Sequence, residues 1–318
     1  MIAHISGDDP VIELRRLHRF FGKTRAVNDI SFHVHRGSVC GYIGPNGAGK
    51  TTSMRIMATL EIPTYGDAFI DGFSVVNDPE MVRRRLGFMP DAFGTYANVN
   101  CAEYLDFFAR SYGLIGRERA ARVRQVLEFT GASGMAEKPI RGLSKGMKQR
   151  LCLGRALIHD PAVLILDEPA AGLDPRARIE LRRMIGTLSS EGKTILISSH
   201  ILTELAEMCD SVAILEQGRL LATGSVEEIQ QQQSHRLEII IRTLGDPSAV
   251  VQYLLQRQLI FNPILDGDTI RGEFDGDPAA QAAVLKELVE QGFLILQFGA
   301  RAKSLEDVFL HVTRGIVQ

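Results

Sequence analysis

Hydrophobic positions along the first two thirds of the chain follow two different periods. Apolar runs of strand length occur at 38–44, 162–169 and 193–200, whereas residues 50–60 and 176–192 repeat their apolar positions at helical spacing. Strands that alternate with helices are typical of a parallel sheet covered by helices. The pattern therefore predicts an α/β protein.

The N-terminal segment adds shorter strands to this pattern. Residues 11–17 and 30–35 are predicted to be strands with a turn region at 20–29 between them. Residues 66–72 and 84–90 have the same apolar character and are predicted to be two further strands.

A long helical region interrupts the alternation of strands and helices. Residues 101–159 have helical spacing, with amphipathic stretches at 102–114 and 117–131. This region is longer than a simple crossover between two parallel strands. We therefore interpret it as a separate helical lobe.

The composition changes at Glu227–Arg236, a glutamine-rich segment that we interpret as a linker helix or loop. The chain is accordingly predicted to divide into domains 11–226 and 237–318. The elements predicted after the linker are strands at 237–243, 260–265, 269–274 and 293–298 and helices at 247–257, 278–291 and 304–313. The first six form a βαββαβ series, which is compatible with a small ferredoxin-like α+β domain.

Composition and charge narrow the classes of function. The 318 residues are 45% hydrophobic and carry a net charge of −2, so a broad nucleic-acid surface is not expected. Cys40, Cys101, Cys152 and Cys209 form no metal-ligand spacing, and buried thiols in a reducing cytosol are expected. We expect neither a signal peptide nor a membrane span, because the N-terminus and the apolar runs lack the necessary pattern and length.

The segment GPNGAGKTT, Gly44–Thr52, matches the phosphate-binding loop pattern in full, between a predicted strand and a predicted helix. Its glycines allow backbone N–H groups to surround a phosphate. Lys50 supplies a charge between the β- and γ-phosphates, and the Thr51 hydroxyl can ligate Mg²⁺. The alternative is a glycine-rich turn with an incidental lysine. The residues expected at the nucleotide are Gly44, Pro45, Asn46, Gly47, Ala48, Gly49, Lys50, Thr51 and Thr52.

Two acidic residues end the apolar strand at 162–169. Asp167 is placed to hold Mg²⁺, and Glu168 to polarise an attacking water as a general base, because ligands of open α/β sheets bind at this edge. Capping of the next helix is the alternative role for such acids, but Asp174 could perform it. A guanine-reading N-K-x-D pattern is missing from the sequence, which favours an ATPase over a GTPase.

Two further positions point to phosphate chemistry. His200 ends another apolar strand and could reach the γ-phosphate and brace both the water and Glu168, although a histidine at a strand end is often structural. The segment RGLSKGMKQRLCLGRAL, Arg141–Leu157, places Ser144 between two glycines before a basic helical run. Such a helix start predicts a second anion-binding mouth.

The ordered motifs GPNGAGKT, LSKGM, LILDEP, AGLDP and SSH resemble the ATP-binding cassette (ABC) ATPase of ABC transporters, over about Val11–Gly224. The resemblance implies a P-loop NTPase fold with a parallel-sheet core, an antiparallel β part and a helical lobe. It also implies a head-to-tail dimer that binds ATP and Mg²⁺. In such a dimer, Ser144, Lys145 and Gly146 would cap the ATP held by the phosphate loop of the partner subunit.

The resemblance also suggests which residues contact the adenine base. Phe21, which precedes Gly22, fits the aromatic residue that stacks on adenine, with Ala26 nearby. Phe20 is the rival position, and both phenylalanines could instead belong to the core.

Two positions depart from the family pattern. The signature usually reads Leu-Ser-Gly-Gly-Gln, whereas this chain has Lys145 and Met147 at the third and fifth places. Asp91 stands where the family carries a glutamine at a strand end. Its carboxylate could ligate Mg²⁺ directly or through water.

The resemblance implies a separate membrane permease as a partner, a second ATPase subunit, and no nucleic acid. The permease would dock near Asp91–Leu105 and hold the chain peripherally on the cytoplasmic face of the membrane. The tail SLEDVFLHVT, 304–313, resembles subunits of bacterial drug and polysaccharide exporters, although an amphipathic helix explains it equally well. Alternatives are a soluble ABC ATPase acting on DNA or ribosomes, and a nucleotide-binding pseudo-ATPase, which Glu168 and His200 disfavour.

Overall fold

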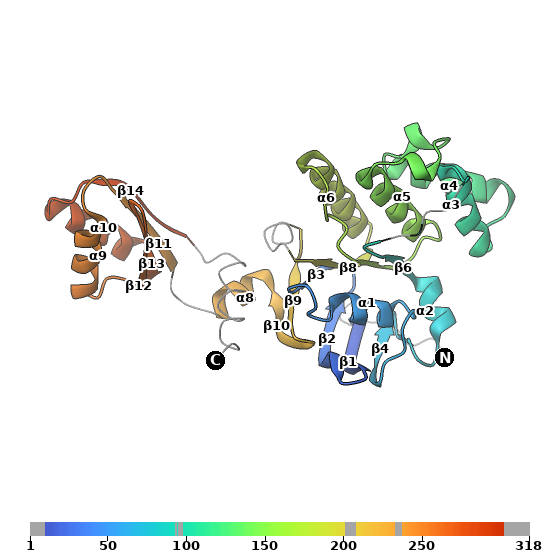
Figure 1. The fold of residues 1–318 in the computed structure, drawn as a ribbon, viewed down its shortest axis with the longest axis horizontal. Helices are drawn as coiled ribbons and strands as arrows, with labels where there is room; N and C mark the ends of the chain where they lie inside the picture. Colours follow the sequence, from blue (N-terminus) through green and yellow to red (C-terminus); the bar gives the residue numbers. More distant parts are fainter. Residues whose placement is uncertain (1–9, 93, 95–97, 201–207, 233–236, 302–318) are drawn as a thin grey trace. The chain divides into compact units, whose positions relative to one another are not determined.

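The structure is a computed structural model, and it describes most of the chain (Figure 1). The described residues are 10–92, 94, 98–200, 208–232 and 237–301. The chain divides into two compact units, Met1–Val226 and Glu227–Gln318.

A six-stranded sheet forms the centre of the first unit, in the order β10-β9-β3-β8-β7-β6. Its strands are β3 (Val39–Ile43), β6 (Leu86–Met89), β7 (Val163–Leu166), β8 (Thr194–Ser199), β9 (Ser211–Glu216) and β10 (Arg219–Ser225). All neighbouring pairs are parallel except β9 with β10. In Figure 1, α6 (Pro175–Ser190) and α1 (Lys50–Met57) lie on opposite sides of this sheet. This double cover explains why every residue of β3, β7 and β8 is buried.

A second, antiparallel sheet has the order β2-β1-β4-β5. Its strands are β1 (Pro10–Phe21), β2 (Thr24–His35), β4 (Tyr65–Ile70) and β5 (Phe73–Ser74). The predicted turn region 20–29 is wrong, because only Gly22 and Lys23 separate β1 from β2. Bulges interrupt the pairing register, and Arg16 and Asp29 adopt positive φ angles of 45° and 62°. These irregularities break the alternation of apolar and polar positions that marks a strand in a sequence.

The hairpin of β9 and β10 was missed by the sequence analysis. Gln217 and Gly218 form its two-residue turn, with φ angles of 48° and 78°, as a tight hairpin turn requires. The Gly218 N–H donates to the Ala48 carbonyl at 3.0 Å, and the Asn28 N–H donates to the Gly218 carbonyl at 2.7 Å. The turn therefore connects the antiparallel sheet with the Gly-rich loop after β3.

The predicted helical lobe is present. It contains α3 (Cys101–Ser111), α4 (Gly116–Phe129), α5 (Lys145–Leu157) and two 3₁₀ turns (Ser133–Met135 and Ile140–Gly142). Asn100 and Glu103 form a reciprocal capping box at the start of α3, which satisfies two backbone donors of its first turn. A short helix, α2 (Pro79–Arg85), precedes β6. The predicted α/β class with a helical lobe is confirmed.

The second unit contains an antiparallel sheet in the order β12-β13-β11-β14. The strands are β11 (Leu237–Thr243), β12 (Phe261–Asp266), β13 (Thr269–Phe274) and β14 (Ile295–Arg301), and the helices are α9 (Pro247–Gln256) and α10 (Pro278–Glu290). This βαββαβ order and strand arrangement are those of the predicted ferredoxin-like fold. Helix α8 (Val226–Gln232) lies within the predicted linker. The predicted helix at 304–313 lies outside the described residues.

Two further features of the described residues are the state of the cysteines and the hydropathy of the helices. All four cysteines are free, and Cys40, Cys101 and Cys152 are buried. Among the described helices, none has both the length and the apolar character that crossing a bilayer requires.

His159 lies at the seam between the helical lobe and the parallel sheet. Its ring stacks on Tyr112, which follows α3, with ring centroids 3.8 Å apart and an interplanar angle of 4°. Its Nε2 is 3.1 Å from the Leu86 carbonyl at the start of β6. Burial lowers the pKa of His159 to about 4, although the hydrogen bond to Leu86 opposes this shift.

We expect His159 to make the stability of the chain dependent on pH. The unfolded chain binds the imidazole proton more tightly, so stability is fully present above the ordinary pKa of 6.5 and is lost as the pH falls towards about 4. This difference corresponds to about 3 kcal/mol. Urea unfolding from pH 7.5 to 4.5 should show a smaller loss in His159→Gln than in the natural chain. Equal losses in both proteins would contradict this role.

Candidate functional site

The phosphate loop joins β3 to α1 at the edge where the parallel strands end. Gly49 has a φ of 99°, and a Cβ there would collide with the Ala26 carbonyl oxygen. A Cβ at Gly44 would meet both the Leu215 carbonyl and Ala48. No side chain caps the start of α1. The backbone N–H groups of this turn are therefore available to an anion.

Lys50, the first residue of α1, is only 6% exposed. Its Nζ donates to the carbonyl oxygens of Gly44 at 2.6 Å and Pro45 at 3.3 Å. The same Nζ is 3.5 Å from Glu168 Oε1. Lys50 and the proposed general base, Glu168, therefore lie side by side.

Asp167 and Glu168 directly follow β7. The Asp167 N–H donates to the Met89 carbonyl of β6 at 2.8 Å, and Glu168 has a φ of 49°. This left-handed conformation is uncommon for a residue other than glycine and is often found at functional sites. It turns the chain away from the strand direction at the position of the proposed base.

Ser198 in β8 holds both acidic residues, and the sequence analysis missed it. Its hydroxyl donates to Asp167 Oδ1 at 2.7 Å and accepts from the Glu168 N–H at 2.8 Å. Ser198 is fully buried. Two adjacent serines inside an otherwise apolar strand were the signal that could have identified it, because buried hydroxyls require partners.

The oxygen donors expected around Mg²⁺ lie together. Burial raises the pKa of Asp167, whereas hydrogen bonds from Ser198 and Thr51 lower it. The negative charges of Glu168 and Asp91 also raise this pKa, so both carboxylates are near. Among the described residues, no group of three or more His, Cys, Asp or Glu side chains could hold a metal ion. Hydroxyl and carboxylate oxygens fit the few protein ligands that Mg²⁺ takes beside phosphate.

His200 is in contact with the proposed base. Its Nδ1 lies 2.9 Å from Glu168 Oε2, and its side chain is 45% exposed. Glu168 is therefore flanked by Lys50 through one oxygen and by His200 through the other. The structure thus brings together all three residues that the sequence analysis assigned to catalysis.

The two candidate adenine-stacking residues differ in their surroundings. Phe21 is 46% exposed, and the Arg19 guanidinium lies 4.4 Å from its ring centroid. Phe20 is partly buried in edge-to-face contacts with His18 and Tyr65 at 5.7 and 6.1 Å. Phe21 has the open surface that base stacking needs, so it remains our prediction.

The start of α5 is the predicted second anion-binding site. Ser144 caps this helix, accepting a hydrogen bond from the Met147 N–H at 3.3 Å. Ser144 and Lys145 are exposed, and Gly146 is partly exposed. Within the described part of the chain, no hydrogen bond or ion pair links 144–146 to the chain's own phosphate loop.

Comparisons with known proteins agree with this geometry. The ABC transporter family matches residues 27–171. Nod factor export ATP-binding protein I of Ralstonia nicotianae is 32% identical, over 96% of this chain and 95% of that protein. Daunorubicin resistance ATP-binding protein DrrA3 of Streptomyces coeruleorubidus is 32% identical, over 96% of each chain. A solved structure of an ATP-binding subunit of an ABC transporter is 32% identical, with a TM-score of 0.65 over 70% of this chain and 92% of that one.

The fold and the comparisons define an ATPase of the P-loop class. The chain belongs to the ABC transporter family, as an ATP-binding subunit. Membership of this family implies a dimer and a membrane permease as the classes of partner.

We expect Gly49→Ala to abolish ATP binding. The added Cβ would collide with the Ala26 carbonyl and would be strained at positive φ, so the phosphate loop would have to move. Gly192→Ala is the matched control, because Gly192 also has a positive φ, of 83°, but has nothing within 4 Å of its Cβ position. Titration calorimetry with ATP distinguishes them. Equal affinities in the two variants would refute the steric argument.

Proposed function

We propose that the chain hydrolyses ATP at sites shared between two copies and thereby drives a separate membrane permease. The single observation that carries this proposal is the position of Glu168, with Lys50 at one carboxylate oxygen and His200 at the other. A carboxylate fixed in this way can accept a proton from a water that attacks the γ-phosphate. His200 would hold Glu168 and the water in line.

We assign Lys50 to the β- and γ-phosphates. Its buried ammonium now rests on two carbonyl oxygens of the loop, which orients it towards the centre of the Gly44–Thr52 turn. Phe21 and Ala26 would contact the adenine base. Thr52 would lie on the side of the loop that faces the α-phosphate. Charge neutralisation by Lys50 makes it necessary for binding as well as for turnover.

We propose that Thr51 and Asp167 hold Mg²⁺ and that Asp91 contributes directly or through water. Bound Mg²⁺ would neutralise charge that develops on the phosphate oxygens. The Ser198 hydroxyl keeps Asp167 oriented towards Thr51. Asp91 is exposed at the end of β6, so it can also respond to groups outside the site.

We propose that Ser144, Lys145 and Gly146 bind the γ-phosphate of the partner subunit's ATP. The exposed start of α5, which Ser144 caps at the Met147 N–H, and the glycine beside it allow close approach of an anion. The chain's own phosphate loop closes around the β-phosphate and leaves one side of the γ-phosphate open. A second copy, placed head to tail, would cover that side.

We propose that the permease docks on the helical lobe. An open groove of about 380 Å³ is lined there by Asn98, Val99, Glu103, Tyr104 and Phe107, and the Phe107 side chain is 55% exposed. It overlaps the Asp91–Leu105 region expected to receive the permease. The residues that line the groove follow Asp91 closely in the sequence. The proposed docking surface and the proposed metal ligand Asp91 are therefore neighbours along the chain.

We propose that the chain acts at the cytoplasmic face of the membrane, held there by the permease, and that transport is outward. The full-length relatives whose names mention Nod factor export and daunorubicin resistance support this direction. Nucleic acid is not proposed as a partner, in line with the net charge of −2.

We expect Glu168→Gln to bind ATP normally and to lose turnover by about 10²–10⁴-fold, the usual contribution of a positioned general base. The amide keeps the size of the carboxylate but accepts no proton. Phosphate release and ATP binding should be measured on the same preparation. If this variant hydrolyses ATP at the rate of the natural chain, Glu168 is not the base.

Mixing two inactive variants tests whether the site is shared. Lys50→Ala lacks the phosphate charge and Ser144→Arg blocks the capping turn, so each should fail as a homodimer. A mixed dimer contains one intact site, formed by Lys50 of one chain and Ser144 of the other. ATP-dependent cross-linking across the interface should therefore return on mixing. If mixing restores nothing, each chain uses its own Ser144.

A further inference from the structure

Lys145 is one of the two residues that differ from the usual family signature. Its side chain lies across Gly172. A Cβ built on Gly172 would be 2.8 Å from Lys145 Nζ and 3.2 to 3.3 Å from its side-chain carbons Cδ and Cε. The lysine stem therefore packs on the bare α-carbon. Gly172 also has a φ of 69°, so both the contact and the backbone favour glycine here.

The same loop is fastened to α5 at a second point. The Gln149 Nε2 donates to the Ala171 carbonyl at 3.3 Å. The next residue, Arg150, forms an ion pair with Glu180 of α6. The start of α5 and the Ala170–Asp174 loop are therefore held together as one surface.

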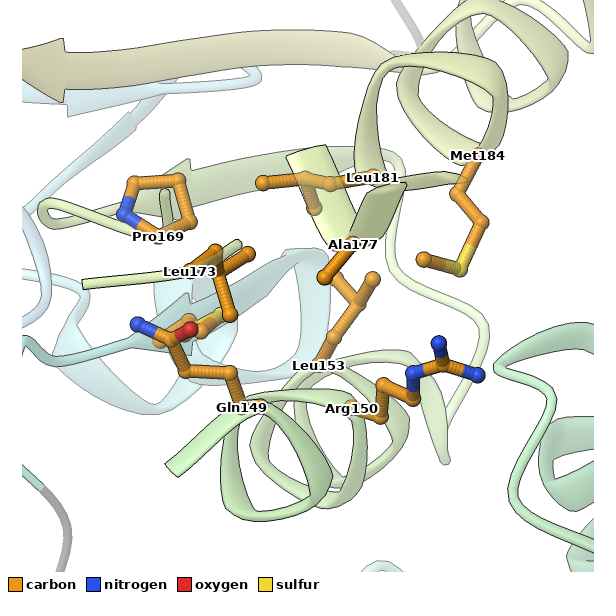
Figure 2. Close-up of a pocket in the computed structure, with 10 residues that line it drawn as sticks. Gln149, Arg150, Leu153, Pro169, Leu173, Ala177, Leu181 and Met184 are labelled. Carbon is orange, nitrogen blue, oxygen red and sulfur yellow. The ribbon is translucent and has the colours of Figure 1, made fainter. Parts of the chain in front are cut away.

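Behind these contacts lies a small apolar cavity of about 10 Å³ between α5 and α6. Figure 2 shows Leu153, Leu173 and Met184 directed into it from these two helices and the loop. The packing of Lys145 against Gly172 and the hydrogen bond from Gln149 to Ala171 thus link this loop to the start of α5.

The charge of Lys145 is poorly placed for the stability of its own helix. It is the first residue of α5, where the helix dipole repels a cation, and the first turn contains no acidic residue. Within the described ranges, no carboxylate forms an ion pair with Lys145. The Lys145 ammonium would therefore be stabilised most by an anion that comes from outside this chain.

We propose that Lys145 is a specificity-determining residue of the shared site: its ammonium, held against Gly172, makes closure of the dimer depend on the γ-phosphate of ATP. This inference rests on the proposed capping of ATP by 144–146 of the partner subunit. Gly172 sets the position of the charge, and Ser144 sets the turn beside it. ADP, which lacks the γ-phosphate, gains nothing from Lys145.

The test measures dimerisation in the Glu168→Gln background, so it does not depend on turnover. In ultracentrifugation with ATP, Lys145→Met should weaken association by about tenfold, since each dimer contains two such contacts. Association with ADP should not change. Lys145→Arg, which keeps the charge, should retain most of the ATP-driven association. The salt dependence of ATP-driven association should be smaller in Lys145→Met.

The contact with Gly172 is tested by a double-mutant cycle. Gly172→Ala should weaken association when Lys145 is present, because the added methyl displaces the ammonium, and should have a smaller effect in Lys145→Ala. Gly192→Ala controls for a methyl at positive φ. Additive effects would overturn the proposed contact.

The outcomes separate this inference from the proposed function. If Glu168→Gln does not dimerise with ATP, the shared site itself is refuted. If it dimerises and Lys145→Met associates equally well with ATP, only the role of Lys145 is refuted. Thermal unfolding of each variant excludes misfolding as the cause of a lost association.

Discussion

Two hydrogen bonds at one hydroxyl fix the geometry of the site. Ser198 on β8 donates to the Asp167 carboxylate and accepts from the Glu168 N–H. These bonds join the ends of two neighbouring parallel strands, and they support Glu168 in a left-handed conformation. Glu168, the proposed base, is in this conformation in contact with Lys50 and His200. The same hydroxyl thus orients both Glu168 and the proposed metal ligand Asp167.

Much of the fold was predictable because burial imposes a clear period. Strands covered on both faces, such as β3, β7 and β8, are fully buried and mostly apolar, and they were found near their true bounds. In the second unit, aspartate caps followed by proline start α9 and α10, and such starts can be read directly from sequence. The antiparallel sheet was harder, because bulges at Arg16 and Asp29 remove the alternation.

The candidate site was predictable where backbone geometry demands particular residues, and less so elsewhere. Gly49 and Lys50 belong to a motif because few residues fit a loop of that shape. Ser198 and Gly172 lie within the SSH and AGLDP motifs, and the backbone at Gly172 also favours glycine, but these motifs do not reveal the contacts that the two residues make. Their roles come from partners distant in sequence, Asp167 and Lys145, and only the folded chain shows those pairs. For the same reason, the sequence left Phe20 as a rival to the preferred Phe21, and only the structure shows which of the two side chains is exposed.

The hairpin turn at Gln217–Gly218 has a consequence for mutational tolerance. It reaches the phosphate loop and the antiparallel sheet through main-chain atoms, with the Gly218 N–H on the Ala48 carbonyl and the Gly218 carbonyl on the Asn28 N–H. Main-chain bonds do not depend on which side chain is present. Many substitutions at Asn28 would therefore leave its main-chain bond intact. Gln217, with its positive φ, favours residues that tolerate a left-handed backbone, and Gly218, where a Cβ would collide with the Ala26 and Arg25 carbonyls, would tolerate almost no substitution. Homologous chains could thus differ in sequence near the nucleotide site while the backbone geometry of this junction stays the same.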